Sequence, residues 1–179
     1  LVPPHHAGDP PLPVLVALHG LGEAVKGPSR GARGWVDDYA VALAEQRLSA
    51  PPLTVEDFQG LADDEEVQRL NGSLAARPFG GMILVLPWTP PHLAKERVPE
   101  SYLPYGSFLV EQVLGRVYRE TPASVLPATT AIDGVSLGGR TALMVGLLFA
   151  KHFGSVGALQ PAMNDSEVGM MVELVRQAR

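Results

Sequence analysis

Cysteine is absent from this chain of 179 residues. Its absence excludes disulfides, thiolate metal sites and a cysteine nucleophile. Basic residues are also few: the chain has 14 lysines and arginines and 19 acidic residues, which gives a net charge of −5. Nucleic acids and anionic membranes attract basic surfaces, so we expect neither as a partner.

Long apolar stretches are lacking as well, and the longest is too short and too interrupted to span a bilayer, so we expect no transmembrane segment. The apolar content of 46% and the length are ordinary for one globular domain with a sizeable core. Residues 1–11 form a Pro-rich stretch that we interpret as an N-terminal leader. The domain is then expected over 12–179, with no cofactor and no metal.

The most informative segment is 134–138, Gly-Val-Ser-Leu-Gly. It follows 129–132, Thr-Thr-Ala-Ile, which predicts a short buried strand, and it precedes the apolar run 141–150, which predicts a buried helix. A Gly-x-Ser-x-Gly turn between a strand and a helix is typical of a nucleophile elbow. There the serine backbone is strained, and side chains in place of the glycines would collide with their neighbours. Ser136 is therefore the candidate nucleophile.

A second match to the same pattern lies at 27–31, Gly-Pro-Ser-Arg-Gly. No apolar strand directly precedes it and no apolar helix follows it. Its composition predicts an exposed loop, so we do not expect Ser29 to be a nucleophile.

Strand-like and helix-like patterns alternate along the chain. The predicted strands are 12–18, 82–86, 129–132 and 155–159. The predicted helices are 36–44, 67–74, 110–118, 141–150 and 168–175. This alternation predicts an α/β fold with a mostly parallel sheet and helices on both faces. The polar stretch 53–77 is expected to be an insertion in the same domain.

Three stretches together resemble the α/β-hydrolase superfamily, and within it the esterase group related to esterase D and the feruloyl esterases. They are 16–22 (Val-Ala-Leu-His-Gly-Leu-Gly), 105–113 (Tyr-Gly-Ser-Phe-Leu-Val-Glu-Gln-Val) and 132–139, which continues into 153–161 (Phe-Gly-Ser-Val-Gly-Ala-Leu-Gln-Pro). The resemblance implies an α/β-hydrolase-type sheet and a small-molecule ester substrate. Three readings of the function stay open: a serine esterase, an acyltransferase with the same serine, and a binding protein without catalysis.

The resemblance also implies roles for single residues. The backbone N–H groups of Leu21 and Leu137 would form an oxyanion hole, in which each donor is worth on the order of 3 kcal/mol. His19 would shape the loop after the first strand and line the substrate pocket, or it is an ordinary turn residue. Trp88 lies in the loop after the second strand, at the edge where open α/β sheets bind ligands. It either lines the substrate pocket or packs against the prolines of its own loop.

The catalytic base and acid have no candidate in the chain. The triad of this superfamily runs serine, acid, histidine, and the only histidine after Ser136 is His152. A helix of the predicted length would carry His152 about 20 Å away. Three acidic residues, Asp165, Glu167 and Glu173, come before the strand that normally presents the acid. We therefore expect the acid and the histidine beyond Arg179, a fold incomplete at its C-terminal end, and no first edge strands.

Overall fold

The computed structural model describes residues 1–3 and 10–178. Residues 4–9 of the predicted leader, 1–11, lie outside the described part. The chain forms two compact units, one of Leu1–Trp35 with Met82–Arg179 and one of Val36–Gly81. The insertion expected at 53–77 lies within the second unit.

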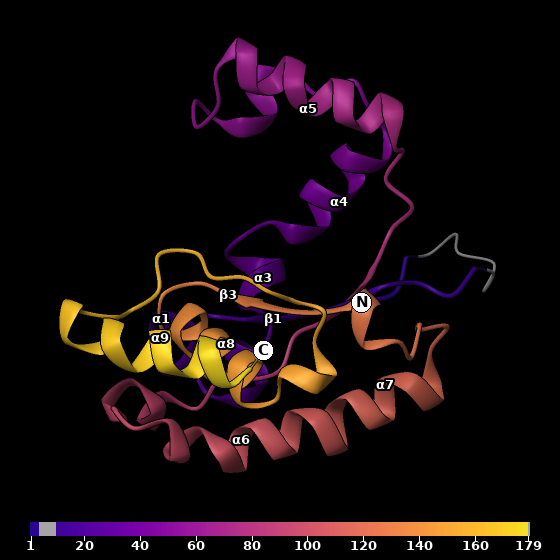
Figure 1. Ribbon diagram of the computed structural model, residues 1–179. Helices are drawn as coiled ribbons and strands as arrows, with labels where there is room; N and C mark the ends of the chain where they lie inside the picture. The colour runs from indigo at the N-terminus through magenta and orange to yellow at the C-terminus, as the bar shows by residue number, and fades with distance from the viewer. Residues whose placement is uncertain (4–9, 179) are drawn as a thin grey trace. The chain divides into compact units, whose positions relative to one another are not determined.

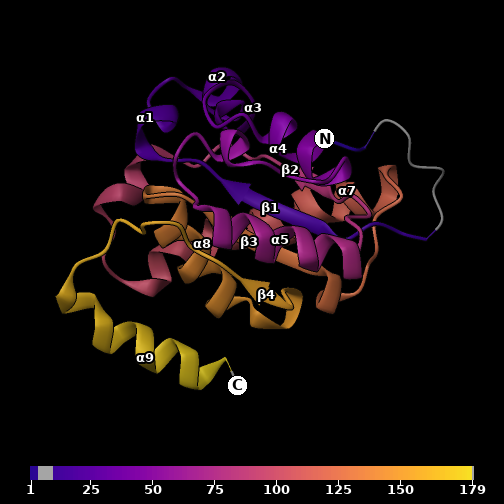
Figure 2. The ribbon, with the colours of Figure 1, turned by 90° about the horizontal axis from the view of Figure 1, so that it is seen from above.

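The first unit is built on one sheet of four parallel strands, in the order β2-β1-β3-β4. The strands are β1 (Val14–Leu18), β2 (Ile83–Val85), β3 (Thr130–Gly134) and β4 (Ser155–Val156). Figure 2 shows this order from above, with β2 and β4 at opposite edges. The predicted α/β class and the parallel sheet are confirmed. From β1 the chain adds β2 on one side and then β3 on the other, so the topological switch point lies between β1 and β3.

One face of the sheet forms the core. Alternate residues of the central strands, including Val16 and Ile132, are completely buried there because side chains on a strand alternate between the two faces. Helix α8 (Leu137–Leu148) packs on this face. A Cβ at Gly146 would come within 2.6 Å of the Val156 side chain and 3.0 Å of Ile132, so the helix backbone approaches the strands closely.

The remaining helices of this unit follow the loops between the strands. They are α1 (Leu21–Ala24), α2 (Pro28–Gly31), α6 (Leu103–Ser107), α7 (Gly115–Glu120) and α9 (Val168–Gln177). A further short helix, α3 (Gly34–Asp37), crosses the boundary of the two units. Short 3₁₀ helices are η2 (Pro91–Lys95), η3 (Pro99–Tyr102), η5 (Pro127–Thr129), η6 (Ala150–His152) and η7 (Asp165–Glu167). Figure 1 shows α6, α7, α8 and α9 on one side of the sheet.

The helix predicted over 110–118 is present, and it is longer than predicted. Helices α6 and α7 are joined by Phe108–Leu114, a π-helical segment named η4. Leu109 and Leu114 of this segment are buried in the core. Their spacing of five residues fits the wider π-helical turn, which brings both onto the same side.

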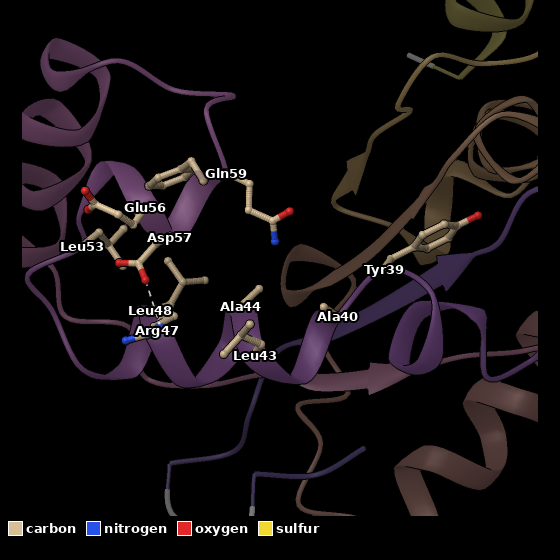
Figure 3. A pocket seen from close by; sticks show the side chains of 11 residues that line it. Tyr39, Ala40, Leu43, Ala44, Arg47, Leu48, Leu53, Glu56, Asp57 and Gln59 are labelled. Carbon is tan, nitrogen blue, oxygen red and sulfur yellow. Dashed lines mark ion pairs between the residues drawn. The ribbon is translucent and has the colours of Figure 1, made fainter.

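The second unit contains two helices, α4 (Val41–Ser49) and α5 (Asp64–Ala76), with a short 3₁₀ helix, η1 (Val55–Phe58), between them. Asp63 begins α5 with a capping box: its carboxylate accepts the Glu66 N–H at 2.9 Å, and Glu66 accepts the Asp63 N–H at 3.1 Å. A cavity of about 360 Å³ lies between α4 and residues 53–59. Figure 3 shows Leu43, Leu48 and the ion pair of Arg47 with Asp57 (3.0 Å) among its walls.

Two predicted elements need correction. The single helix over 36–44 is wrong, because Ala40 has a left-handed φ of 52° and separates α3 from α4. The fourth strand is shorter than the predicted 155–159: its ladder ends at Val156, and Leu159 returns to the sheet only through one bridge to Val135. No helix in the described residues is long and apolar enough to cross a membrane.

Candidate active site

Ser136 lies at the junction of β3 and α8, next to the topological switch point. Its φ of 54° and ψ of −115° are unusual for a residue with a side chain, and it is the N-cap of α8. Ser136 is half-buried, and its Oγ forms no hydrogen bond with any group of the described residues. The serine hydroxyl is therefore free at the N-terminus of a buried helix, where the helix dipole favours negative charge.

Three glycines allow this turn because there is no room for a Cβ. A Cβ at Gly134 would overlap the Gly138 carbonyl. A Cβ at Gly138 would overlap the Leu18 carbonyl and lie 2.7 Å from the His19 oxygen. A Cβ at Gly139 would lie 2.8 Å from the Gly134 oxygen. The glycines thus let the turn after β3 pack directly on the end of β1.

Two backbone amides are available near this contact. Leu137 is the first residue of α8, and Leu21 is the first residue of α1. Within the described part of the chain, neither N–H donates a hydrogen bond to another protein group. The first N–H groups of a helix have no partner inside the helix, so both remain able to bind an acceptor.

His19 is completely buried and is bonded at both ring nitrogens. Its Nε2 accepts the Thr89 backbone N–H at 3.0 Å, so the ring hydrogen must be on Nδ1, which donates to the Gly20 oxygen at 3.0 Å. Burial lowers the pKa of His19, although the Gly20 carbonyl and Glu23 oppose this. A neutral ring with both nitrogens engaged is suited to joining the loops after β1 and β2, and unsuited to accepting a proton from Ser136.

Trp88 lies beside Thr89 in the loop after β2 and is half-buried. Its indole N–H donates to the Ala24 oxygen of α1 at 3.0 Å. A Cβ at Gly31 would lie 2.9 Å from its ring, so the indole also packs on α2. The Trp88 carbonyl accepts the hydroxyl of buried Tyr105 at 3.0 Å, and burial raises the pKa of Tyr105, which keeps this donor neutral. The ring therefore contacts both α1 and α2.

A buried ion pair near Ser136 was not predicted from the sequence. Arg140, in the first turn of α8, pairs with Glu167 at the end of η7, and both side chains are buried. Arg140 Nη2 also donates to the Glu96 oxygen at 2.5 Å. A charged residue between the elbow and the apolar run 141–150 was a possible signal for Arg140, but its partner Glu167 is distant in the sequence.

The other residues considered lie apart from this cluster. His152 is in η6, beyond the 12 residues of α8, which extend about 18 Å from Ser136. Ser29 is exposed and lies in α2, a short helix where the sequence predicts a loop. No histidine of the described residues is hydrogen-bonded to Ser136, and a triad acid and histidine beyond Arg179 stay a prediction. In the same part of the chain, no group of three or more potential ligands is arranged to bind a metal.

Residues 87–173, which include Ser136, match the family described as "Putative esterase". No curated protein matches the chain. A solved ferulic acid esterase superposes with a TM-score of 0.58 at 18% identity, covering 97% of this chain and 57% of the other.

Two further solved structures have lower scores. The CE1 ferulic acid esterase of Anaeromyces mucronatus, in complex with ferulic acid, has a TM-score of 0.49 at 22% identity over 89% of this chain and 50% of its own. S-formylglutathione hydrolase (FrmB) of Staphylococcus aureus has a TM-score of 0.44 at 15% identity over 94% and 56%. The chain spans about half the length of these structures. The chain therefore has the α/β-hydrolase fold, and its match to the family described as "Putative esterase" covers residues 87–173.

Proposed function

We propose that this protein is a serine esterase in which Ser136 attacks the carbonyl carbon of a carboxylic ester. The observation that carries the proposal is the backbone of Ser136, with its φ of 54° and ψ of −115° between a buried strand and a buried helix. A strained residue costs free energy and persists where the surrounding structure fixes it, most often at functional sites. The family match over 87–173 supports an ester as the substrate class.

In the proposed reaction, a bond forms between Ser136 Oγ and the carbonyl carbon while the hydroxyl proton passes to a base. The carbonyl oxygen then becomes an oxyanion, and the free N–H groups of Leu21 and Leu137 are the proposed donors to it. When the tetrahedral species collapses, the bond to the alcohol oxygen breaks and the alcohol leaves with a proton. Water then hydrolyses the acyl-serine and restores the hydroxyl group.

The test is to label the full-length gene product with a fluorophosphonate and to locate the adduct by mass spectrometry. We expect the adduct on Ser136, and we expect Ser136→Ala to lower kcat/KM for p-nitrophenyl acetate by at least about 10³-fold. Ser29→Ala is the matched control, since it changes the serine of the other Gly-x-Ser-x-Gly segment, and it should leave both labelling and activity intact.

The same assay decides between the esterase and its alternatives. An adduct on Ser29, or full activity in Ser136→Ala, would overturn the proposal. Transfer of the acyl group to an added alcohol in preference to water would identify an acyltransferase. Absence of both labelling and turnover in a folded protein would identify a binding protein.

We also propose that Trp88 forms part of the substrate pocket. Its indole is fixed by the bond to Ala24, and it lies next to Thr89, which is bonded to His19 after β1. A rigid aromatic ring at this edge suits contact with an acyl or aryl group. Trp88→Phe should change the relative kcat/KM for acetyl, butyryl and aryl esters. If kcat/KM changed by the same factor for all three esters, Trp88 would only hold α1 in place and would not line the pocket.

A further inference from the structure

Both peptide groups of Ser136 are bound by one short segment, residues 159–162, which we name the strap. The Ser136 N–H donates to the Leu159 oxygen at 3.0 Å. The Ser136 carbonyl accepts the Ala162 N–H at 2.9 Å, together with the Arg140 N–H at 3.0 Å. The strap therefore contacts the elbow on both sides of the candidate nucleophile.

The strap is tightly packed and strained. A Cβ at Gly139 would lie 3.2 Å from the Leu159 oxygen and 3.3 Å from the Pro161 Cα. Gln160 has a φ of 43° although it carries a side chain, and the following proline restricts its backbone further. A strained residue beside the elbow needs contacts elsewhere that keep it in place.

The segment that follows the strap is held by the buried pair of Arg140 and Glu167. Glu167 lies five residues after the end of the strap, and its Oε2 accepts the N–H of Asn164, two residues after that end, at 3.1 Å. Its carboxylate is paired with Arg140, whose Nη2 also donates to the Glu96 oxygen of the loop after β2. Only 1% of Arg140 and 5% of Glu167 is exposed. The pair thus connects α8, the segment that follows the strap and the loop after β2 at one point.

A buried ion pair is a weak source of stability, because the cost of removing both charges from water offsets their attraction. Its fixed geometry can instead favour one arrangement of the segments it joins. We propose that Arg140 and Glu167 are positioning residues that set the strap, and through it the backbone of Ser136. The proposal rests on the proposed role of Ser136 as nucleophile.

The first experiment measures amide hydrogen exchange and needs no catalysis. Glu167→Gln should speed exchange of the Ser136 and Ala162 amides at least about tenfold relative to the amides of Val16 and Ile132 in the central strands. The matched control is Glu173→Gln in α9, whose carboxylate is exposed and lies 3.8 Å from Arg176. It should leave this ratio unchanged. If exchange of all four amides were accelerated equally, the ion pair would contribute only to the stability of the whole fold, and the proposal would be overturned.

The second experiment separates positioning from folding. In the double variant Arg140→Met with Glu167→Leu, apolar side chains replace both charges, so stability should be largely retained. We still expect fluorophosphonate labelling of Ser136 to slow at least about tenfold, with unchanged labelling in Glu173→Gln. Labelling of the double variant at the wild-type rate would overturn the proposal. If the wild-type protein itself is not labelled, the nucleophile assignment fails, and the exchange ratio still decides the role of the strap.

Discussion

At the scale of single residues, the candidate site depends as much on positions without a side chain as on Ser136 itself. Gly138 is the most constrained of these, because its missing Cβ leaves room for the carbonyl groups of Leu18 and His19 at the end of β1. Backbone atoms cannot rotate away as a flexible side chain can. The close approach of the elbow to β1 therefore requires a glycine at position 138.

We expect Gly138→Ala to lower the free energy of unfolding by about 3 kcal/mol, because the added methyl group forces the backbones of β1 and α8 apart. Gly169→Ala is the control: it adds the same methyl group in α9, where a Cβ would have no neighbour within 4 Å. It should be neutral or stabilising by up to about 1 kcal/mol. Urea unfolding followed by tryptophan fluorescence measures both, and equal stabilities would contradict the close approach of the elbow to β1.

His19 makes stability depend on pH. Its folded pKa lies below the ordinary 6.5, so the unfolded chain binds a proton first as the pH falls. The contribution of neutral His19 is therefore complete above pH 6.5 and is lost as the pH falls from 6.5 through the lowered pKa. Protonation would place a hydrogen on Nε2 and break the bond from the Thr89 N–H.

We expect the unfolding free energy of the wild type to fall between pH 7 and pH 5 more steeply than that of His19→Gln, whose amide oxygen can accept the Thr89 N–H at any pH. Denaturant titrations across this range measure the two slopes. His92→Gln, at an exposed position, should keep the wild-type slope. A variant His19→Gln with that same slope would show that His19 is protonated equally in both states.

At the scale of elements, apolar patterns predicted the strands well and the irregular elements poorly. Two apolar runs, 12–18 and 82–86, each contain a strand of the sheet. The break at Ala40 has no such signal, because alanine favours a helix and its left-handed φ is imposed by the surrounding structure. The π-helical turn of η4 likewise has an ordinary helical sequence.

The end of β4 lies beside a close contact that sequence alone did not reveal. A Cβ at Gly157 would lie 2.6 Å from a carboxylate oxygen of Asp133 in β3, so this side chain occupies the space next to β4. The sequence places a glycine at 157 and an aspartate at 133. Only the register of β3 and β4 brings the two together.

At the scale of the whole molecule, the position of each loop of the candidate site could be predicted, because each loop follows a predicted strand. The contacts between the loops could not be predicted. Thr89 and His19 are 70 residues apart, and Arg140 and Glu96 are 44 apart. Neither pair leaves a local pattern in the sequence. The Gly-x-Ser-x-Gly segment could be found because its geometric requirements fall within five consecutive residues.

The described residues provide a free serine hydroxyl and free amides, and no histidine bonded to that serine. We therefore expect the 179-residue polypeptide to hydrolyse p-nitrophenyl acetate slowly, at roughly 10³–10⁴-fold above the reaction in water. Added imidazole should raise the rate, because it can accept the proton from Ser136. Stopped-flow and steady-state assays measure the rate of p-nitrophenyl acetate hydrolysis with and without imidazole. A burst followed by fast turnover without imidazole would mean that a base is already present in these residues.

The backbone hydrogen bonds around Ser136 also bear on how this site could be transferred to another protein. The Ser136 peptide groups bond to Leu159, Ala162 and Arg140 through main-chain atoms, and the glycines contribute only space. Grafting the five residues 134–138 into a different strand and helix would therefore carry the motif without the geometry. A successful graft would need the end of β1 and the strap as well, so the smallest transferable unit comprises three separate segments of the chain.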